Sequence, residues 1–384
     1  MFSSFWQNLR DTGYEAKVQS FEAAAVSLKQ GAGRAEHIII FSSASKGVPA
    51  ELAPQRLSTL VDAGTNILLA VPPTSAELWR DFAREFEVDY DDRLAEAHDH
   101  FGPINGSHTA LVLPLDEVAS PFLSATARAG PPVLYRGGLH TNGRSPLLNS
   151  ILVAPATAYS AQPDSPVESL RSYGRQSSLV SAFQARNNAR VTFVGSVDLF
   201  TDAAAETPVQ TAQSAYPRSG NSAFTRDLAQ WTFGARGHRR VVSVQHGLVG
   251  SDVSNPLSYR VRDKMYFTLE VEAPEEDSPT DLQLGFTMLD PHLRIPLIST
   301  RLANGHQRFE ASLTVPDRHG VFTLRVDHRR SGWDNLESAT VVSITPPRHD
   351  EYDRFIRGAL PYYGSAFSVS LGLVVFLFFW ILKC

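Results

Sequence analysis

An uncharged apolar run at the carboxyl end constrains the fold of this chain more than any other feature. The run extends over 25 residues from Gly358 to Leu382, between Arg357 and Lys383. A helix needs about 20 predominantly apolar residues to cross a bilayer. A buried helix in a soluble core is the alternative, but such helices are usually shorter and carry a polar face, which this run lacks. The sequence therefore predicts one transmembrane helix over residues 361–382.

Aromatic residues lie near both ends of this run. Tyr362 and Tyr363 stand at its start and Trp380 near its end. At a rise of 1.5 Å per residue, a helix places Tyr362 and Trp380 about 27 Å apart, close to the thickness of the hydrocarbon core. Because Tyr and Trp are enriched at both membrane–water interfaces, their positions favour a span.

Small residues recur every four positions within the predicted span, at Gly364, Ser368 and Gly372. Such a stripe allows a second helix to approach closely, which is a common packing device in membranes. Glycine is also generally more frequent in transmembrane helices than in soluble ones. Both interpretations are open, and the first makes these three residues candidates for an intramembrane contact.

The charge and cysteine content narrow the possible functions of the remaining chain. The protein has 384 residues and a formal net charge of −5. This balance offers no basic surplus, so we predict no nucleic-acid partner. Cys384 is the only cysteine, which excludes an internal disulfide, a zinc–cysteine site and a cysteine nucleophile. The lack of disulfides mildly favours a cytosolic location for the soluble part.

The amino terminus predicts a helix rather than a signal peptide. Charged residues occur early, and no apolar stretch of signal-peptide length precedes or follows them. Apolar residues instead recur at i, i+3, i+4 and i+7, which is one face of an amphipathic helix over residues 2–12. That face consists of Phe2, Phe5, Trp6 and Leu9.

Residues 1–238 are predicted to form an α/β domain. Apolar runs without alternation are typical of strands buried on both faces of a parallel sheet, and they occur at 36–43, 66–73, 108–114 and 189–196. Helical patterns are found between or after them, at 50–64, 75–86 and 221–234. The order strand–helix–strand predicts an open parallel sheet covered by helices.

Residues 239–349 change to an alternation of period two. Short alternating strands separated by turn residues predict an antiparallel β-sandwich. The strands are expected at 265–273, 281–289, 308–316, 320–328 and 338–347. A juxtamembrane linker over 350–360 then leads to the span, and residues 383–384 form the tail beyond it.

Two short motifs contain residues that could bind a metal ion. His98, Asp99 and His100 could supply two imidazoles, but no third ligand stands at a recognisable spacing, so a solvated loop is the better interpretation. The sequence from Asp89 to Asp91 has the Asp-x-Asp form with which some sugar-nucleotide transferases hold a divalent ion. Three residues carry little information, and the stretch reads as a turn. We therefore predict neither a metal site nor a bound cofactor.

Two further positions have a possible role outside metal binding. Ser196 follows a predicted strand at the end where open α/β sheets place ligands, but it lacks the G-x-S-x-G pattern and a His placed to activate it. A turn residue is the better interpretation, and no catalytic residue is predicted. Asn105 begins Asn-Gly-Ser, which accepts an N-glycan if the domain faces a secretory lumen.

Three long stretches resemble one known protein family. They are QARNNARVTFVGSVDLFTD (184–202), VPDRHGVFTLRVDHRRSGW (315–333) and EYDRFIRGALPYYGSAFSVSLG (351–372), with looser agreement at LDPHLRIPL (289–297). In this order they are similar to the 48-kDa subunit family of the oligosaccharyltransferase, and the resemblance covers nearly the whole chain.

The resemblance implies a single-pass type I protein of the endoplasmic reticulum membrane with its soluble domains in the lumen. It implies an accessory, non-catalytic subunit, since catalysis in that complex belongs to a separate multispanning subunit. The implied partners are this catalytic subunit and the ribophorin II-like and defender-against-death-like subunits. The implied first domain is similar to class I glutamine amidotransferases without their cysteine nucleophile, and the absence of cysteine before Cys384 agrees.

One departure from the family leaves an alternative function open. Family members begin with a cleaved signal and a first strand, and neither precedes the helix predicted at 2–12, so we expect the sequence to lack the start of a longer precursor. Taken at face value, the same features describe a tail-anchored cytosolic interaction module. The basic residues before the span, such as Arg357, also favour a cytosolic soluble part.

Overall fold

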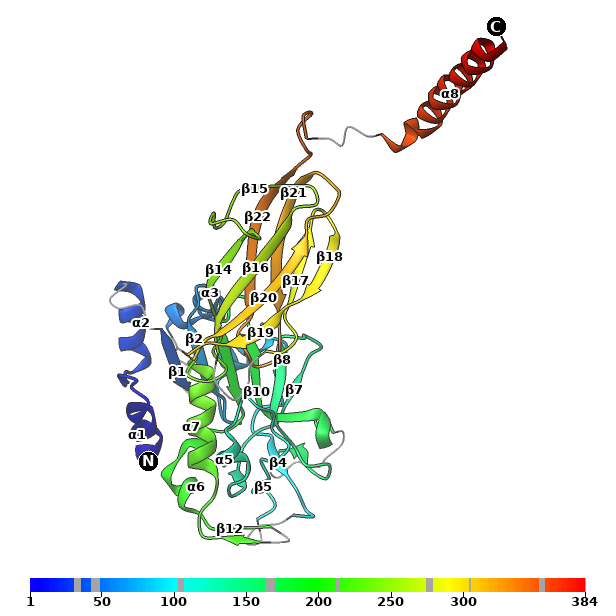
Figure 1. Cartoon of the computed structure of the whole chain (residues 1–384). Coiled ribbons are helices and arrows are strands. Elements are labelled where there is room, and N and C mark those ends of the chain that lie inside the picture. Colours follow the sequence, from blue (N-terminus) through cyan, green and yellow to red (C-terminus); the bar gives the residue numbers. More distant parts are fainter. Residues whose placement is uncertain are drawn as a thin grey trace.

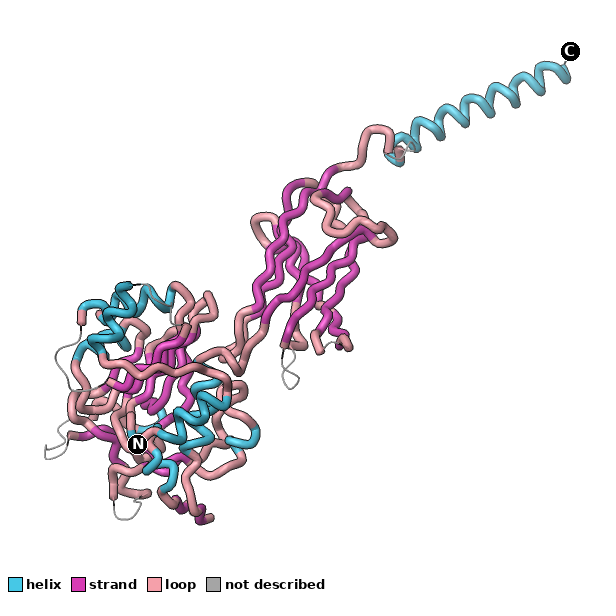
Figure 2. Tube along the Cα trace, turned by 90° about the vertical axis from the view of Figure 1, so that its left-hand side faces the viewer, coloured by secondary structure: helices cyan, strands magenta, loops and turns pink. Residues whose placement is uncertain are grey.

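A computed structural model describes residues 1–30, 36–42, 49–102, 107–162, 170–211, 214–273, 279–303, 305–351 and 356–383. An α/β region and a β-sandwich follow one another along the molecule, and a separate helix, α8 (Leu360–Lys383), lies beyond the far end of the sandwich (Figure 1). A tube view turned by 90° shows the same succession of parts (Figure 2).

The main sheet of the α/β region is mixed, which corrects the prediction of an open parallel sheet. Its strands lie in the order β1-β2-β11-β10-β7-β3, and β8 also pairs with β10. The β1–β2 and β2–β11 pairs are parallel, and the other pairs are antiparallel. The bounds are β1 His37–Phe41, β2 Asn66–Ala70, β3 Val88–Tyr90, β7 His140–Asn142, β8 Leu148–Val153, β10 Ser177–Gln184 and β11 Arg190–Val194.

A tight turn explains why the sheet changes direction between β10 and β11. Asn188 has a φ of 66°, and the amide of Ala185 donates to the carbonyl of Ala189 across 2.8 Å. A connection this short can only join antiparallel strands, because a parallel pair needs a crossover of a dozen or more residues. The apolar pattern of residues 189–196 correctly predicted a buried strand, but it carried no information on strand direction.

The predicted strand at 108–114 belongs to a different sheet. Only Leu111–Leu113 (β5) is extended, and it pairs antiparallel with β6 (Val133–Tyr135) outside the main sheet. A short apolar strand can be buried equally well in the main sheet or in a separate pair of strands, so its sequence did not distinguish the two. Two other small pairs complete the strands of this region, β4 (Glu96–His98) with β9 (Tyr159–Ala161) and β12 (Val209–Gln210) with β13 (Ala215–Tyr216).

Helices cover both faces of the main sheet because alternate residues of its strands point to opposite sides. Leu68 of β2 packs in one apolar cluster with α1 and α7, whereas Leu69 packs in another with α3 and α4. The helices are α1 Ser3–Asp11, α2 Phe21–Gln30, α3 Pro54–Asp62, α4 Glu77–Arg84, α5 Ala125–Arg128, α6 Asp202–Glu206 and α7 Asn221–Thr232. Short 3₁₀ turns occur at Ala50–Leu52, Gly174–Gln176, Asp198–Phe200 and Arg357–Ala359.

The amphipathic helix predicted at the amino terminus is confirmed as α1. Phe5 and Leu9 are buried, and the Phe5 ring lies 5.0 Å from that of Phe200. The Asp202 carboxylate accepts hydrogen bonds from the amides of Ser3 and Ser4, each at 2.8 Å. These amides have no partner within the helix, so a carboxylate from a distant element caps its first turn.

The β-sandwich follows the predicted alternation. One sheet has the order β14-β16-β20-β19 and the other β15-β22-β21-β17-β18. In β16 and β20 every second side chain is buried between the sheets, as Phe267, Leu269 and Phe309 illustrate. The bounds are β14 Arg240–Leu248, β15 Ser258–Arg260, β16 Lys264–Glu272, β17 Gln283–Thr287, β18 Pro291–Pro296, β19 Ile298–Arg301, β20 Gln307–Thr314, β21 Gly320–His328 and β22 Leu336–Thr345.

Candidate functional site

The carboxy-terminal helix forms as the sequence predicts. α8 begins at Leu360 and ends at Lys383, and among the described residues it is the one helix long and apolar enough to cross a membrane, judged by length and composition. Tyr362, Tyr363 and Trp380 are exposed near its two ends. An apolar helix with all its described side chains exposed has no soluble core to bury it, so a bilayer is the environment that its surface fits.

The small stripe on α8 is open to a neighbour. A Cβ atom added at Gly364 or Gly372 would meet no atom within 4 Å. The Ser368 hydroxyl donates to the Ser365 carbonyl at 2.8 Å, so its polar group is satisfied within the helix. A second helix could approach this face without leaving a buried hydroxyl unpaired, and its use as a contact stays a prediction.

The crevice beside Ser196 is filled by a neighbouring loop. Ser196 is 1% exposed, and its hydroxyl donates to the carbonyl of Arg136. The amide of Gly138 donates to the carbonyl of Gly195 at 2.9 Å. A Cβ atom at Gly137 would lie 2.4 Å from that same carbonyl oxygen, so only glycine fits at this approach. The Ser196 hydroxyl is therefore buried against the backbone of a neighbouring loop, which agrees with the turn interpretation.

The two carboxylates of the Asp-x-Asp motif have different environments and different partners. Asp89 pairs with Arg171 across 2.5 Å on the surface. Asp91 is buried and accepts a hydrogen bond from the hydroxyl of Ser172 at 2.5 Å, and burial raises the pKa of its carboxyl group. One carboxylate is engaged by a cation and the other by a core hydroxyl, so the two do not face a common ion.

The structure adds a third imidazole to the His98–His100 motif. The ring of His108 lies 4.5 Å from that of His100, whose Nε2 is 2.7 Å from the Tyr159 hydroxyl. The His98 ring stacks on Tyr159 at 5.8 Å. These rings contact an aromatic side chain, and within the ranges given above no three His, Cys, Asp or Glu side chains are arranged to hold a metal ion. Asn105, the predicted glycan acceptor, lies outside the described residues.

A buried polar cluster, which we call the joint, connects the α/β region to the sandwich. Its centre is the ion pair between Arg190 at the start of β11 and Asp334 just before β22, with Nη2 and Oδ1 2.6 Å apart. Both side chains are buried. Burial lowers the pKa of Arg190, while the carboxylate opposes that shift. Hydrogen bonds to the remaining polar atoms of such a pair offset the cost of removing its two charges from water.

Backbone carbonyls accept hydrogen bonds from both terminal nitrogens of Arg190, whereas its buried Nε has no partner among the described residues. Its guanidinium donates to the carbonyls of Trp231, Arg236 and Gly237, at and beyond the end of α7. The last carbonyls of a helix lack intrahelical partners and carry partial negative charge, so a cation is favourable there. The guanidinium also lies 4.7 Å over the Trp231 ring. Arg190 therefore binds α7, β11 and the start of the sandwich together.

Residues of the sandwich complete the joint from the other side. Asp334 Oδ2 lies 2.7 Å from Nδ1 of His238, and this hydrogen bond raises the pKa of the imidazole. Trp333 lies under the guanidinium of Arg239 at 4.1 Å. The Trp231 indole donates to the Gly332 carbonyl at 2.8 Å. The predicted domain boundary at 238/239 lies among the residues of the joint, and this division of the chain stays a prediction.

Sequence reasoning missed the joint, although the resembling motifs contain some of its residues. Gln184 and Arg190 lie in the stretch 184–202, and Trp333 ends the stretch 315–333. The side-chain amide Nε2 of Gln184 donates to the Trp333 carbonyl at 2.9 Å, which joins the two motifs directly. An Arg directly before an apolar run was the signal available in the sequence, because a charge that is buried at the end of such a strand requires a partner.

These features define a class of protein: a two-part soluble body, held together by a buried polar joint and followed by one helix fit to span a membrane. Two protein-family models match it, OST48 N-terminal domain over residues 1–235 and OST48 middle domain over residues 246–384. The chain belongs to the family of the 48 kDa subunit of dolichyl-diphosphooligosaccharide–protein glycosyltransferase.

Relatives from distant organisms match almost end to end. The proteins of this name from Drosophila melanogaster and Arabidopsis thaliana are 34% and 33% identical, over 98% of this chain and 87% and 88% of theirs. That from Danio rerio is 31% identical over 97% of this chain and 87% of its own. Among solved structures, the PmoD soluble domain from Methylocystis sp. ATCC 49242 covers 27% of this chain and 89% of its own, with 12% identity and a TM-score of 0.21, too low to indicate a shared fold.

Proposed function

We propose that this chain is a non-catalytic subunit of an oligosaccharyltransferase complex in the endoplasmic reticulum membrane. It assists assembly and the en bloc transfer of a dolichol-linked oligosaccharide to Asn-x-Ser/Thr. The observation that carries the proposal is membership of the 48 kDa subunit family over nearly the whole chain. The filled crevice at Ser196 supports a role without chemistry of its own, since a loop carbonyl occupies the serine hydroxyl.

The same proposal assigns the parts of the chain to two sides of the membrane. Residues 1–238 and 239–349 are lumenal domains, 350–360 is the linker, 361–382 spans the bilayer and 383–384 is cytosolic. The joint holds the two lumenal domains in one orientation, which a scaffold needs in order to present a fixed surface. The amidotransferase-like description of the first domain belongs to this proposal as well.

The partners in this proposal are the catalytic subunit and the ribophorin II-like and defender-against-death-like subunits. The small stripe at Gly364, Ser368 and Gly372 is the contact that α8 offers to one of them inside the membrane. The open space around both glycines supports this assignment. Tight association of helices in lipid rests on such close approach, because lipid tails are as apolar as the helices themselves.

Depletion of this subunit from cells, followed by its re-expression, tests the proposed role in N-glycosylation. Cells depleted of this subunit should underglycosylate a reporter that carries Asn-x-Ser/Thr sites, and re-expression of the protein should restore glycosylation. In the same cells, Asn105→Gln should remove an endoglycosidase-sensitive mobility shift of the subunit itself. Normal glycosylation after depletion contradicts the proposal.

A second candidate is the tail-anchored cytosolic interaction module. Arg357 directly before the span favours it, because basic residues concentrate on the cytosolic side. Long translocated domains largely escape this rule, however, and the family match does not depend on it. The absence of any glycan on Asn105, together with accessible soluble domains in sealed membranes, would favour the cytosolic module.

A further inference from the structure

The sandwich has an open seam along one side. β14 is the edge strand of its sheet, and β15 covers only the end of β22, through the pairing of 258–260 with 343–345. Within the described chain, no strand pairs with the remainder of β22, from Leu336 to Val342, on the side that faces β14. Edge strands present unpaired backbone groups that can accept an additional strand.

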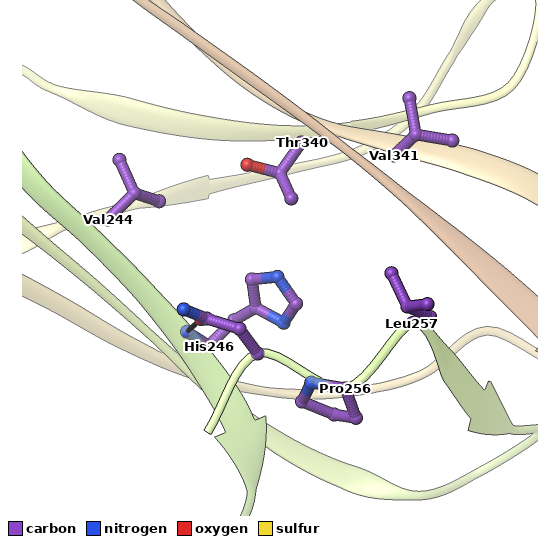
Figure 3. Close-up of a pocket in the computed structure, with 7 residues that line it drawn as sticks. Val244, His246, Pro256, Leu257, Thr340 and Val341 are labelled. Atoms are coloured by element: carbon purple, nitrogen blue, oxygen red, sulfur yellow. Dashed lines mark hydrogen bonds between the residues drawn. The ribbon is translucent and has the colours of Figure 1, made fainter. Parts of the chain in front are cut away.

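A cavity of about 200 Å³ opens in this seam (Figure 3). Its wall contains no charged side chain, so an ionic or phosphate-bearing ligand would find no counter-charge there. The Leu257 side chain at its rim is 84% exposed and that of Val341 59% exposed. Apolar side chains make up most of the wall: Val244, Pro256, Leu257 and Val341.

One buried polar side chain points into this cavity. His246 is 3% exposed, and Figure 3 shows its ring between Val244, Thr340 and Leu257. Its Nδ1 lies 2.6 Å from the Tyr259 hydroxyl. Burial raises the pKa of Tyr259 to about 12, so this hydroxyl keeps its proton, and Nδ1 is the acceptor available to it among the described residues.

The proton of the neutral imidazole is therefore on Nε2. Burial lowers the pKa of His246, which keeps the ring uncharged at neutral pH. In the neutral ring one nitrogen donates and the other accepts, so an Nδ1 that accepts from Tyr259 leaves Nε2 as a donor. No hydrogen-bond acceptor for Nε2 is found in the part of the chain that the structure describes. Nε2 therefore faces the cavity as a donor that water or an acceptor supplied from outside can satisfy.

We propose that this seam binds an extended, uncharged segment of a partner polypeptide, with one large aliphatic or aromatic side chain in the cavity and a main-chain carbonyl on His246 Nε2. An extended segment fits both the apolar cavity and the imidazole donor, because neighbouring residues of a strand can supply a side chain to one and a carbonyl to the other. Its backbone can also pair with the free edge of β22. An acyl chain would fill the apolar wall and leave the imidazole donor unpaired. This inference rests on the proposed function as a subunit, and it adds where and how a partner docks.

A matched pair of variants tests the site in full-length protein within its own membranes. Val341 and Val321 are exposed valines on neighbouring strands of the same sheet, at 59% and 61%, and only Val341 lines the cavity. Val341→Glu should reduce one co-purifying subunit about tenfold or more, because its carboxylate would lose water against an apolar side chain. Val321→Glu should leave the recovery of every subunit unchanged.

A photoreactive amino acid at position 257 identifies the occupant in the assembled membrane complex. We expect a cross-link that maps by mass spectrometry to an uncharged segment of another subunit. A lipid adduct, a cross-link to a second copy of this chain, or no cross-link overturns the proposal, as does equal loss with both Glu variants. Failure of the wild-type chain to co-purify with any oligosaccharyltransferase subunit would instead refute the proposed function, so the two failures are distinguishable.

Discussion

Removal of Arg190 should weaken the protein more than removal of any surface arginine. Arg190→Ala takes away the guanidinium partner of a buried carboxylate and one hydrogen bond from each of three backbone carbonyls near the end of α7. The carbonyls of Trp231 and Gly237 keep a backbone amide donor, and that of Arg236 loses the donor described here. Truncating one member of a buried ion pair costs roughly 3–5 kcal/mol of unfolding free energy. Asp334→Ala should cost less, near 3 kcal/mol on the same scale, because the guanidinium retains those carbonyls.

Urea unfolding of the full chain in detergent micelles, followed by tryptophan fluorescence, measures this effect. Trp231 and Trp333 both lie in the joint, so their emission reports its opening. The control is Arg325→Ala, which breaks an exposed pair with Glu337 at 3.2 Å and should cost roughly 0–1 kcal/mol. Equal losses for Arg190→Ala and Arg325→Ala would refute the reasoning.

A double-mutant cycle separates the ion pair from the other contacts of Arg190. Arg190→Met with Asp334→Leu removes both charges together and leaves neither group buried without its partner. The double variant should therefore lose less free energy than the sum of the two single losses, by roughly 0.5–3 kcal/mol for residues in direct contact. Strict additivity would show that the pair contributes nothing as a pair.

Three further variants have defined outcomes. The hydrogen bond to Asp334 raises the pKa of His238 above 6.5, so the stability that this imidazole contributes is complete below pH 6.5 and declines as pH rises through the raised pKa. The midpoint of urea unfolding, measured against pH, should fall over this range. His238→Gln should remove that pH dependence. Ser196→Ala should leave reporter glycosylation in depleted cells fully rescued, whereas a loss of rescue with normal folding would support chemistry at this serine. Gly364→Leu with Gly372→Leu should preserve membrane insertion, measured by carbonate extraction, and weaken co-purification of a partner.

The glycine pair and His238→Gln each have a matched control. Ala366→Leu adds similar bulk to the opposite face of α8 and should leave co-purification unchanged. His306 pairs with Glu270 at 3.0 Å away from the joint, so His306→Gln should leave the pH slope that we assign to His238 in place. Unchanged recovery of every partner with both glycines replaced would exclude the small stripe as a contact.

Local sequence patterns correctly predicted the helices and strands whose apolar residues repeat at the period of that element. The spacing of Phe5 and Leu9 predicted α1, and the alternation through Phe267 and Leu269 predicted a sandwich strand. The uncharged run predicted α8 to within two residues at its start. In each case one face or the whole surface of the element is apolar, so burial alone determines the conformation.

Local sequence patterns did not predict which distant strands or side chains pair with each other. The run at 108–114 is apolar enough for the main sheet, yet β5 pairs with β6 elsewhere. The strand at 240–248 was not predicted, because β14 is an edge strand with valines partly exposed on both faces. Arg190 and Asp334 lie 144 positions apart, and no spacing rule connects them. The joint follows from tertiary placement, which a single sequence does not encode in any local window.

Protease protection combined with co-purification tests the central claim most directly. The protein is examined in sealed microsomes with and without detergent, and the detergent extract is purified through this subunit. We expect the soluble body to be digested only after detergent opens the vesicles, and the catalytic oligosaccharyltransferase subunit to co-purify with it. Digestion in intact vesicles, with no oligosaccharyltransferase subunit recovered, would contradict a lumenal scaffold.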